Sequence, residues 1–184
     1  MSAPPITIVG GGLAGSEAAL QLADAGHRVR LFEMRPTVKT PAHETPLLGE
    51  LVCSNSLRSN DPAGAAGLLK EELRQLSCRL LDLAEEARVP AGQALAVDRL
   101  KFASVITKRI EEHPNIEVIR EELTTLPDEP AILAPGPLAS PALMEALEAF
   151  LGNRRLFFFD AIAPIVDADS LNMDRLFFAT RYNN

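Results

Sequence analysis

A glycine-rich segment near the N-terminus is the feature that most restricts how this chain can fold. Residues 6–9 are a short β-branched run, and Gly10, Gly12 and Gly15 follow it in the pattern G-x-G-x-x-G. Residues 16–23 have the composition of a helix, Gly26 supplies its stop, and residues 28–32 resemble a second strand. Strand, glycine turn, helix and strand together predict a complete βαβ unit, and therefore parallel strands.

The glycine motif also predicts a dinucleotide site. Its three glycines allow a tight turn, a close approach of the backbone to a pyrophosphate, and close packing of helix on strand. The helix that follows points unpaired N–H groups and its positive dipole end toward the same place. The candidate cofactor-binding residues are therefore Gly10, Gly11, Gly12, Leu13, Ala14 and Gly15. The alternative is a glycine turn that is structural only.

An acidic residue strengthens this interpretation. Glu33 lies 21 positions after Gly12, close to the spacing of about 20 expected for an acid that binds ribose hydroxyls. Because a carboxylate repels a 2′-phosphate, Glu33 favours FAD or NAD over NADP. Arg35 has two interpretations of equal weight: it contacts a cofactor phosphate, or it is a solvent-exposed arginine beside an acid.

The remainder of the chain continues the alternation of strands and helices. Residues 36–67 are rich in proline and glycine and are expected to be irregular, and leucines from Leu69 to Leu83 at helical spacing predict one core-facing helix. A further helix is expected after Asp98, strands at residues 116–120 and 131–134, and a last helix from Ser140. This order predicts an α/β fold with a doubly wound parallel sheet, with a Rossmann-like domain over residues 1–155 and a second, mixed region beginning at residues 156–184.

Composition and charge exclude several classes of protein. The 18 Lys and Arg against 25 Asp and Glu give a net charge of −7, which argues against a general nucleic-acid binder but allows a local basic patch. No segment approaches the roughly 20 apolar residues of a membrane span, and no secretory signal is evident, so we expect a cytoplasmic protein. Two cysteines without a CxxC pair and three scattered histidines predict neither a metal site nor a disulfide scaffold.

Cys53 is the candidate catalytic residue. It lies in the irregular stretch, followed by Ser54, Asn55 and Ser56, where hydroxyl and amide groups could hold a thiolate near a ligand. The alternative is an inert, buried cysteine. Cys78, among core-pattern leucines, is expected to be structural, and His43 to belong to a surface loop or to the site.

Five segments together resemble a known family of enzymes. They are residues 8–18, 31–36, 40–43, 52–57 and 88–99, and the resemblance continues through residues 136–138 and 163–166 to 181–182, so that it covers essentially the whole chain. In these segments the chain resembles the folate- and FAD-dependent tRNA (uracil-5-)-methyltransferases of bacteria. The Cys53 segment and residues 88–99 are the more specific, since many flavoproteins share the glycine motif.

The resemblance implies a glutathione-reductase-like FAD domain with an inserted domain. It also implies methylation of a T-loop uridine of tRNA, with methylenetetrahydrofolate as carbon donor, reduced FAD in the transfer and NAD(P)H as the source of electrons. Uracil C5 is a poor nucleophile until a thiolate adds to C6, so a cysteine is needed. Cys53 matches one of the two that the family uses, and its role as nucleophile, flavin shield or proton carrier stays open.

The chain departs from the family in two ways. Where the family has Ala-Thr-Gly-Pro-Leu against the dinucleotide, this chain has Pro135 before Gly136, and proline lacks an N–H to donate. Gly136 is retained as a cofactor-binding candidate. Family members are also more than twice as long, so we expect a fragment that by itself binds FAD poorly and does not methylate tRNA.

Three alternatives remain at the level of sequence. One is the related FAD-dependent enzyme that installs carboxymethylaminomethyl groups on wobble uridines, which shares the glycine motif. Another is a folate- and FAD-dependent methyltransferase acting on ribosomal RNA. The third is a noncatalytic nucleotide-binding module.

Overall fold

The centre of the molecule is a parallel four-stranded sheet. The computed structural model describes residues 3–152, 172 and 175. The sheet contains β1 (Ile6–Val9), β2 (Val29–Phe32), β6 (Ile116–Ile119) and β7 (Ala131–Leu133), in the order β6-β2-β1-β7. Ile8 of β1 is in register with Leu31 on one side and Ile132 on the other. The prediction of an α/β fold with parallel strands is thereby confirmed.

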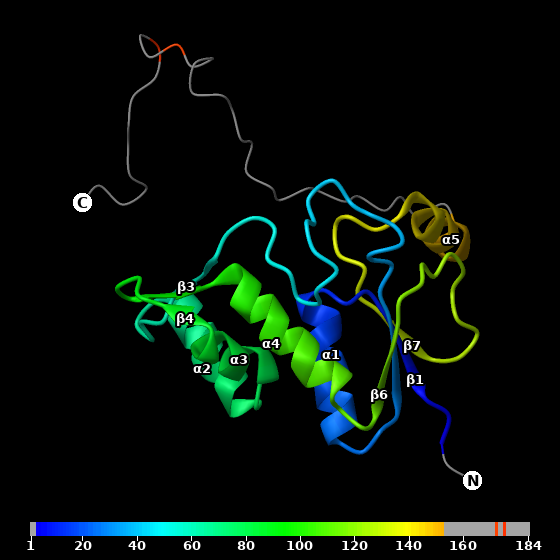
Figure 1. Cartoon of the computed structure of the whole chain (residues 1–184), viewed down its shortest axis with the longest axis horizontal. Coiled ribbons are helices and arrows are strands. Elements are labelled where there is room, and N and C mark those ends of the chain that lie inside the picture. The colour runs from blue at the N-terminus through cyan, green and yellow to red at the C-terminus, as the bar shows by residue number, and fades with distance from the viewer. Residues whose placement is uncertain (1–2, 153–171, 173–174, 176–184) are drawn as a thin grey trace.

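Two long helices pack beside this sheet. Helix α1 (Leu13–Asp24) contacts β1 and β2, and α4 (Arg99–Glu111) contacts β6 and α1, as Figure 1 shows. Their apolar faces meet the strands in a core where Ile8, Leu31 and Ile106 are fully buried. Asp98 caps α4 through a 2.9 Å hydrogen bond from the Lys101 amide, as the sequence predicts.

A second, antiparallel sheet was not predicted. It consists of β3 (Ser56–Ser59), β5 (Ala94–Val97) and β4 (Arg88–Val89), in the order β3-β5-β4. These strands lie with α2 and α3 at the end of the molecule far from β7 (Figure 1). Residues 56–59 therefore form a strand where an irregular segment was expected. Residues 56–59 contain no β-branched or aromatic residue, so their composition gives no strand signal.

The prediction of one helix over the leucine stripe was wrong. The stretch forms two helices, α2 (Ala65–Gln75) and α3 (Arg79–Glu86), separated by a turn in which Ser77 has φ +58°. The carboxylate of Glu17, on α1, accepts hydrogen bonds from the amides of Arg79 and Leu80 at 2.9 and 2.8 Å. This contact from another helix satisfies the first donors of α3, so the new helix can begin there.

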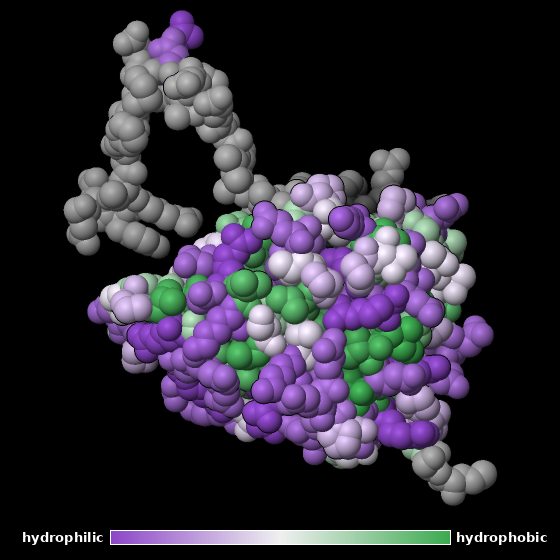
Figure 2. Space-filling model, in the orientation of Figure 1, coloured by the Kyte–Doolittle hydropathy of each residue, from purple (hydrophilic) through white to green (hydrophobic). Residues whose placement is uncertain are grey.

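The chain after β7 leads into the last described helix, α5 (Pro141–Leu151). Ser140 caps it through a 3.3 Å hydrogen bond from the Leu143 amide, as expected. The proposed domain boundary after residue 155 lies outside the described residues, as does nearly all of the proposed second region. Within the described part of the chain, no helix has the length and apolarity needed to cross a membrane. On the face drawn in Figure 2, hydrophobic surface is broken into patches among hydrophilic residues.

Candidate functional site

A cleft opens where the direction of the sheet reverses. From β1 the chain adds β2 and β6 on one side and later β7 on the other side, so β1 and β7 form a topological switch point, the place where open α/β sheets bind ligands. A cavity of about 320 Å³ lies there, within the size range of ligand pockets. Val9 and Gly10 line it from the end of β1, and Ala134 and Gly136 from the end of β7.

Two glycines of the motif are required by close packing. A Cβ on Gly15 would lie 1.8 Å from the carbonyl oxygen of Gly10, and a Cβ on Gly10 would lie 2.3 Å from that of Ala134. Gly10 also has φ +98°, which side chains rarely allow. These glycines bring α1 against β1, and the loop against the chain after β7.

Gly12 differs from both. A Cβ on Gly12 would meet nothing within 4 Å, and Gly12 lines the cleft together with Leu13 and Ala14. It is the N-cap of α1, and this helix start has neither a side-chain cap nor an acidic residue in its first turn. The backbone N–H groups and positive dipole end of α1 therefore face the cleft in the way an anionic phosphate requires.

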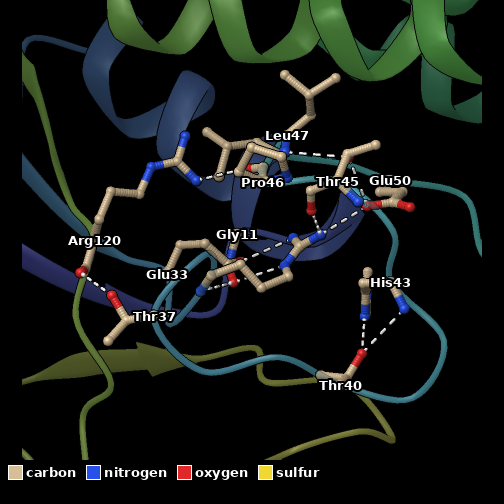
Figure 3. Close-up of polar contacts among 12 residues, drawn as sticks. Gly11, Glu33, Thr37, Thr40, His43, Thr45, Pro46, Leu47, Glu50 and Arg120 are labelled. Carbon is tan, nitrogen blue, oxygen red and sulfur yellow. Dashed lines mark hydrogen bonds and ion pairs between the residues drawn. The ribbon is translucent and has the colours of Figure 1, made fainter.

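Glu33 lies at the end of β2 and is tied to the glycine loop (Figure 3). Its Oε2 accepts hydrogen bonds from the Gly11 amide at 3.0 Å and from Nη2 of Arg35 at 3.1 Å. Its Oε1 accepts from the backbone N–H and Nε of Arg35 at 3.0 and 2.9 Å. The carboxylate is 94% buried and lines the cleft, where the sequence places a ribose contact.

Arg35 is buried, so the interpretation of it as a solvent-exposed arginine was wrong. Its side chain is only 4% exposed, and besides Glu33 it pairs with Oε2 of Glu50 at 3.0 Å. Glu50 in turn accepts hydrogen bonds from the hydroxyl of Thr45 at 2.7 Å and from the amides of Thr45 and Glu44. Sequence analysis missed Glu50, because it lies in a loop 15 residues from its partner; its position just after Gly49 was the one weak signal.

This network sets the charge of the nearby groups. Burial alone would raise the pKa of Glu33, but the hydrogen bonds and charge of Arg35, with the Gly11 amide, lower it below its ordinary value. Burial would also raise the pKa of Glu50, but the hydrogen bonds from Glu44 and Thr45 and the charge of Arg35 lower it below its ordinary value. Both carboxyl groups are therefore ionised at neutral pH.

His43 is placed in the cleft rather than away from it. It lines the cavity and its Nδ1 is within hydrogen-bond distance of the Thr40 hydroxyl (Figure 3). Burial, together with the charge of Arg35, lowers the pKa of His43, against the opposing effect of Glu50 and Glu33. A neutral imidazole at pH 7 follows, which can accept or donate a hydrogen bond but adds no charge.

Cys53 does not line this cleft. It is exposed and borders a separate, open hollow with Ser54, Asn55 and Asp98, although its neighbour Val52 lines the cleft. Cys78 is partly buried, packs against the core, and has its pKa raised by that burial. The structure thus distinguishes an exposed thiol, whose neighbour Val52 lines the cleft, from a partly buried thiol that packs against the core.

These features fit an adenine dinucleotide. The open side of Gly12 and the uncapped start of α1 suit a diphosphate, and Glu33 and Gly136 border the same cavity. Gly136 has φ +67° with open space beside it. Fold and cleft together define a Rossmann-like α/β protein with a glycine loop at the switch point of its sheet. More particularly, the chain belongs to the glucose inhibited division protein A family, whose model matches residues 5–184.

Three similar curated proteins share one name. The methylenetetrahydrofolate--tRNA-(uracil-5-)-methyltransferase TrmFO of Brevibacillus brevis is 52% identical over 183 residues, which are 100% of this chain and 42% of that protein. TrmFO of Bacillus subtilis has the same identity and coverage, and that of Desulfotalea psychrophila is 53% identical over 97% of this chain and 41% of its own length. The chain therefore spans about two fifths of the length of these relatives.

Solved structures confirm the fold. GidA of Aquifex aeolicus, in its form II crystal, matches with a TM-score of 0.53 and 18% identity, over 68% of this chain and 20% of that protein. The form I crystal gives the same TM-score and identity. At this identity the likeness concerns the arrangement of strands and helices.

Proposed function

We propose that this chain is the FAD-binding portion of a folate-dependent tRNA uracil-5-methyltransferase. The observation that carries the proposal is the identity of about 52% over the whole chain with proteins named TrmFO. The cleft agrees with it, because its glycine loop, uncapped helix and buried acid suit the adenine dinucleotide half of FAD. The substrates are then tRNA and methylenetetrahydrofolate, with NAD(P)H as the source of electrons.

Different groups of the chain would bind the diphosphate and the ribose of the cofactor. Backbone amides of Gly12, Leu13 and Ala14 would bind the diphosphate, and Glu33 would face the ribose. When bound, FAD supplies the reducing equivalents that convert a methylene group to a methyl group. Gly136 would let the chain after β7 approach the dinucleotide closely, without a Cβ between them.

Cys53 is proposed as the thiol of the reaction. Uracil C5 becomes nucleophilic when a thiolate adds to C6, and only an accessible thiol can meet a base carried by a large RNA. Cys53 is exposed and follows directly on a residue of the cleft wall. Cys78 is unsuited to this task, because burial raises its pKa and so disfavours the thiolate.

Modified nucleosides in the cell test the proposal. The gene that encodes this chain is deleted, and 5-methyluridine in bulk tRNA is measured by mass spectrometry before and after complementation. We expect the deletion to remove the mark, the wild-type gene and Cys78→Ala to restore it, and Cys53→Ala to leave it absent. Cys78→Ala is the matched control, since it removes the same group from a site away from the cleft.

Other outcomes assign the gene differently. Loss of the carboxymethylaminomethyl mark on wobble uridines would indicate the related wobble enzyme, and loss of 5-methyluridine from ribosomal RNA would indicate a different RNA substrate. No change in any of these nucleosides would favour a noncatalytic nucleotide-binding module.

A further inference from the structure

Three charged side chains are buried side by side at the ribose end of the cleft. Arg35 lies between Glu33 and Glu50, with shortest nitrogen–oxygen distances of 2.9 and 3.0 Å. The exposed fractions of the three side chains are 4, 6 and 7%. Burial at this level makes each partner costly to leave unpaired, so the arrangement is strongly fixed.

The two carboxylates and one backbone carbonyl together accept most of the hydrogen bonds that the guanidinium can donate. Nε and Nη2 of Arg35 donate to Glu33, while Nη1 donates to Glu50 and to the carbonyl of Thr45 at 3.2 Å. A guanidinium has five N–H groups, and four are used by these bonds. Most of the hydrogen-bond capacity that an arginine would otherwise offer to a phosphate is therefore used within the protein.

The charge of the cluster is also unfavourable to a phosphate. Two ionised carboxylates and one guanidinium leave one net negative charge. Glu121 and Glu122 line the same cleft, and Arg35 is the sole lysine or arginine among the lining residues that the structure describes. A second phosphate on the ribose would meet negative charge from several directions.

We propose that Glu50 is a specificity-determining residue, which holds Arg35 away from the ligand and so makes the cleft reject a 2′-phosphorylated adenosine. The inference rests on the proposed cofactor site and adds a second acid to the discrimination expected from Glu33. Glu50 acts on the ligand through Arg35 and through its own charge.

Binding of a matched pair of ligands tests this role. ADP-ribose and 2′-phospho-ADP-ribose differ by one phosphate, and their affinities for the purified chain are measured by calorimetry. The wild-type chain is expected to prefer ADP-ribose by about tenfold or more. Glu50→Gln is expected to reduce that preference by about tenfold, because it removes one negative charge and replaces the charge-assisted hydrogen bond from Nη1 of Arg35 with a weaker neutral one.

Two control variants isolate the effect. Glu44→Gln removes the same charge from an exposed side chain of the same loop, and Glu50→Asp keeps the charge at the same position. Both are expected to keep the wild-type preference within about threefold. A preference unchanged in Glu50→Gln, or reduced equally in Glu44→Gln, would overturn the role of Glu50.

The wild-type chain provides a test that needs no variant, should Glu50→Gln fail to fold. Its preference for ADP-ribose must weaken as salt is added, because the exclusion is electrostatic. Equal affinity for the two ligands at low salt would overturn the proposal. Weak binding of both ligands is expected of this chain, but a complete failure to bind either of them, even at high ligand concentration, would overturn the cofactor site itself and this inference with it.

Discussion

Replacing Gly15 with alanine should separate helix α1 from strand β1. The new Cβ would lie 1.8 Å from the Gly10 carbonyl oxygen, whereas ordinary contact begins at 3.4 Å, so two backbone segments must move apart by about 1.6 Å. Overpacking costs about 1–3 kcal/mol, and this contact belongs at the upper end because neither backbone can rotate away. The better helix propensity of alanine returns about 1 kcal/mol, leaving a net loss of about 2 kcal/mol.

Gly12→Ala is the matched substitution in the same loop. Its Cβ meets nothing within 4 Å, so the free energy of unfolding should change by less than about 1 kcal/mol. The added methyl group would stand where the diphosphate approaches, and ADP-ribose affinity should fall at least about tenfold.

Urea unfolding followed by circular dichroism measures the first effect, and calorimetry the second. With a urea dependence of about 2 kcal/mol per molar, Gly15→Ala should lower the unfolding midpoint by about 1 M, and Gly12→Ala should lower it by less than half as much. A stable Gly15→Ala chain would refute the packing argument. A Gly12→Ala chain that binds ADP-ribose normally would refute the placement of the diphosphate.

Three further predictions concern other parts of the molecule. Glu33→Gln should lower the free energy of unfolding by about 3 kcal/mol at pH 7, because it leaves Arg35 underpaired. Because the folded-state pKa of Glu33 is lowered from 4.5, its contribution to stability is present above pH 4.5 and is lost as the pH falls further. The variant should therefore lose less stability in acid than the wild-type chain, and an equally steep loss would contradict this. Asp98→Ala should lower the free energy of unfolding, measured in urea, by about 1 kcal/mol because it removes the α4 cap, while Asp98→Asn should change it little. Equal losses in the two variants would indicate that the charge of Asp98, and not its cap, stabilises the helix. Iodoacetamide should modify exposed Cys53 faster than Cys78, whose partial burial raises its pKa. Peptide mass spectrometry measures the two rates, and equal rates would argue against the shielding of Cys78.

The elements around the cleft could be predicted because local signals and tertiary packing agree there. In the βαβ unit, Gly10 marks the turn after the first strand and Gly26 marks the end of the helix. The caps Asp98 and Ser140 begin α4 and α5 as the sequence indicates. Elsewhere the deciding contact comes from a distant residue. The leucine spacing continues across the break at Ser77, and it is Glu17 of α1 that fixes where α3 begins.

In the candidate site, too, some residues could be predicted from local sequence signals and others depend on contacts with distant residues. The glycine motif and Glu33 follow a spacing that can be recognised in sequence, and the structure places them at one cavity. The state of Arg35 could not be predicted, because it depends on Glu50 and the carbonyl of Thr45 in a loop of irregular backbone. Cys53 likewise lies in that stretch, and its exposed position beside the cleft depends on how residues 45–52 fold.

The most direct test of the account is an amide titration by nuclear magnetic resonance. ADP-ribose is added to the isotope-labelled chain, and the backbone amides of Gly12 and Ala14, which line the cleft, are compared with those of Leu69 and Leu73, which line a different hollow. The account predicts large, saturable shifts at the first two and none at the other two. Saturable shifts at Leu69 and Leu73 with unmoved amides at the start of α1 would contradict it.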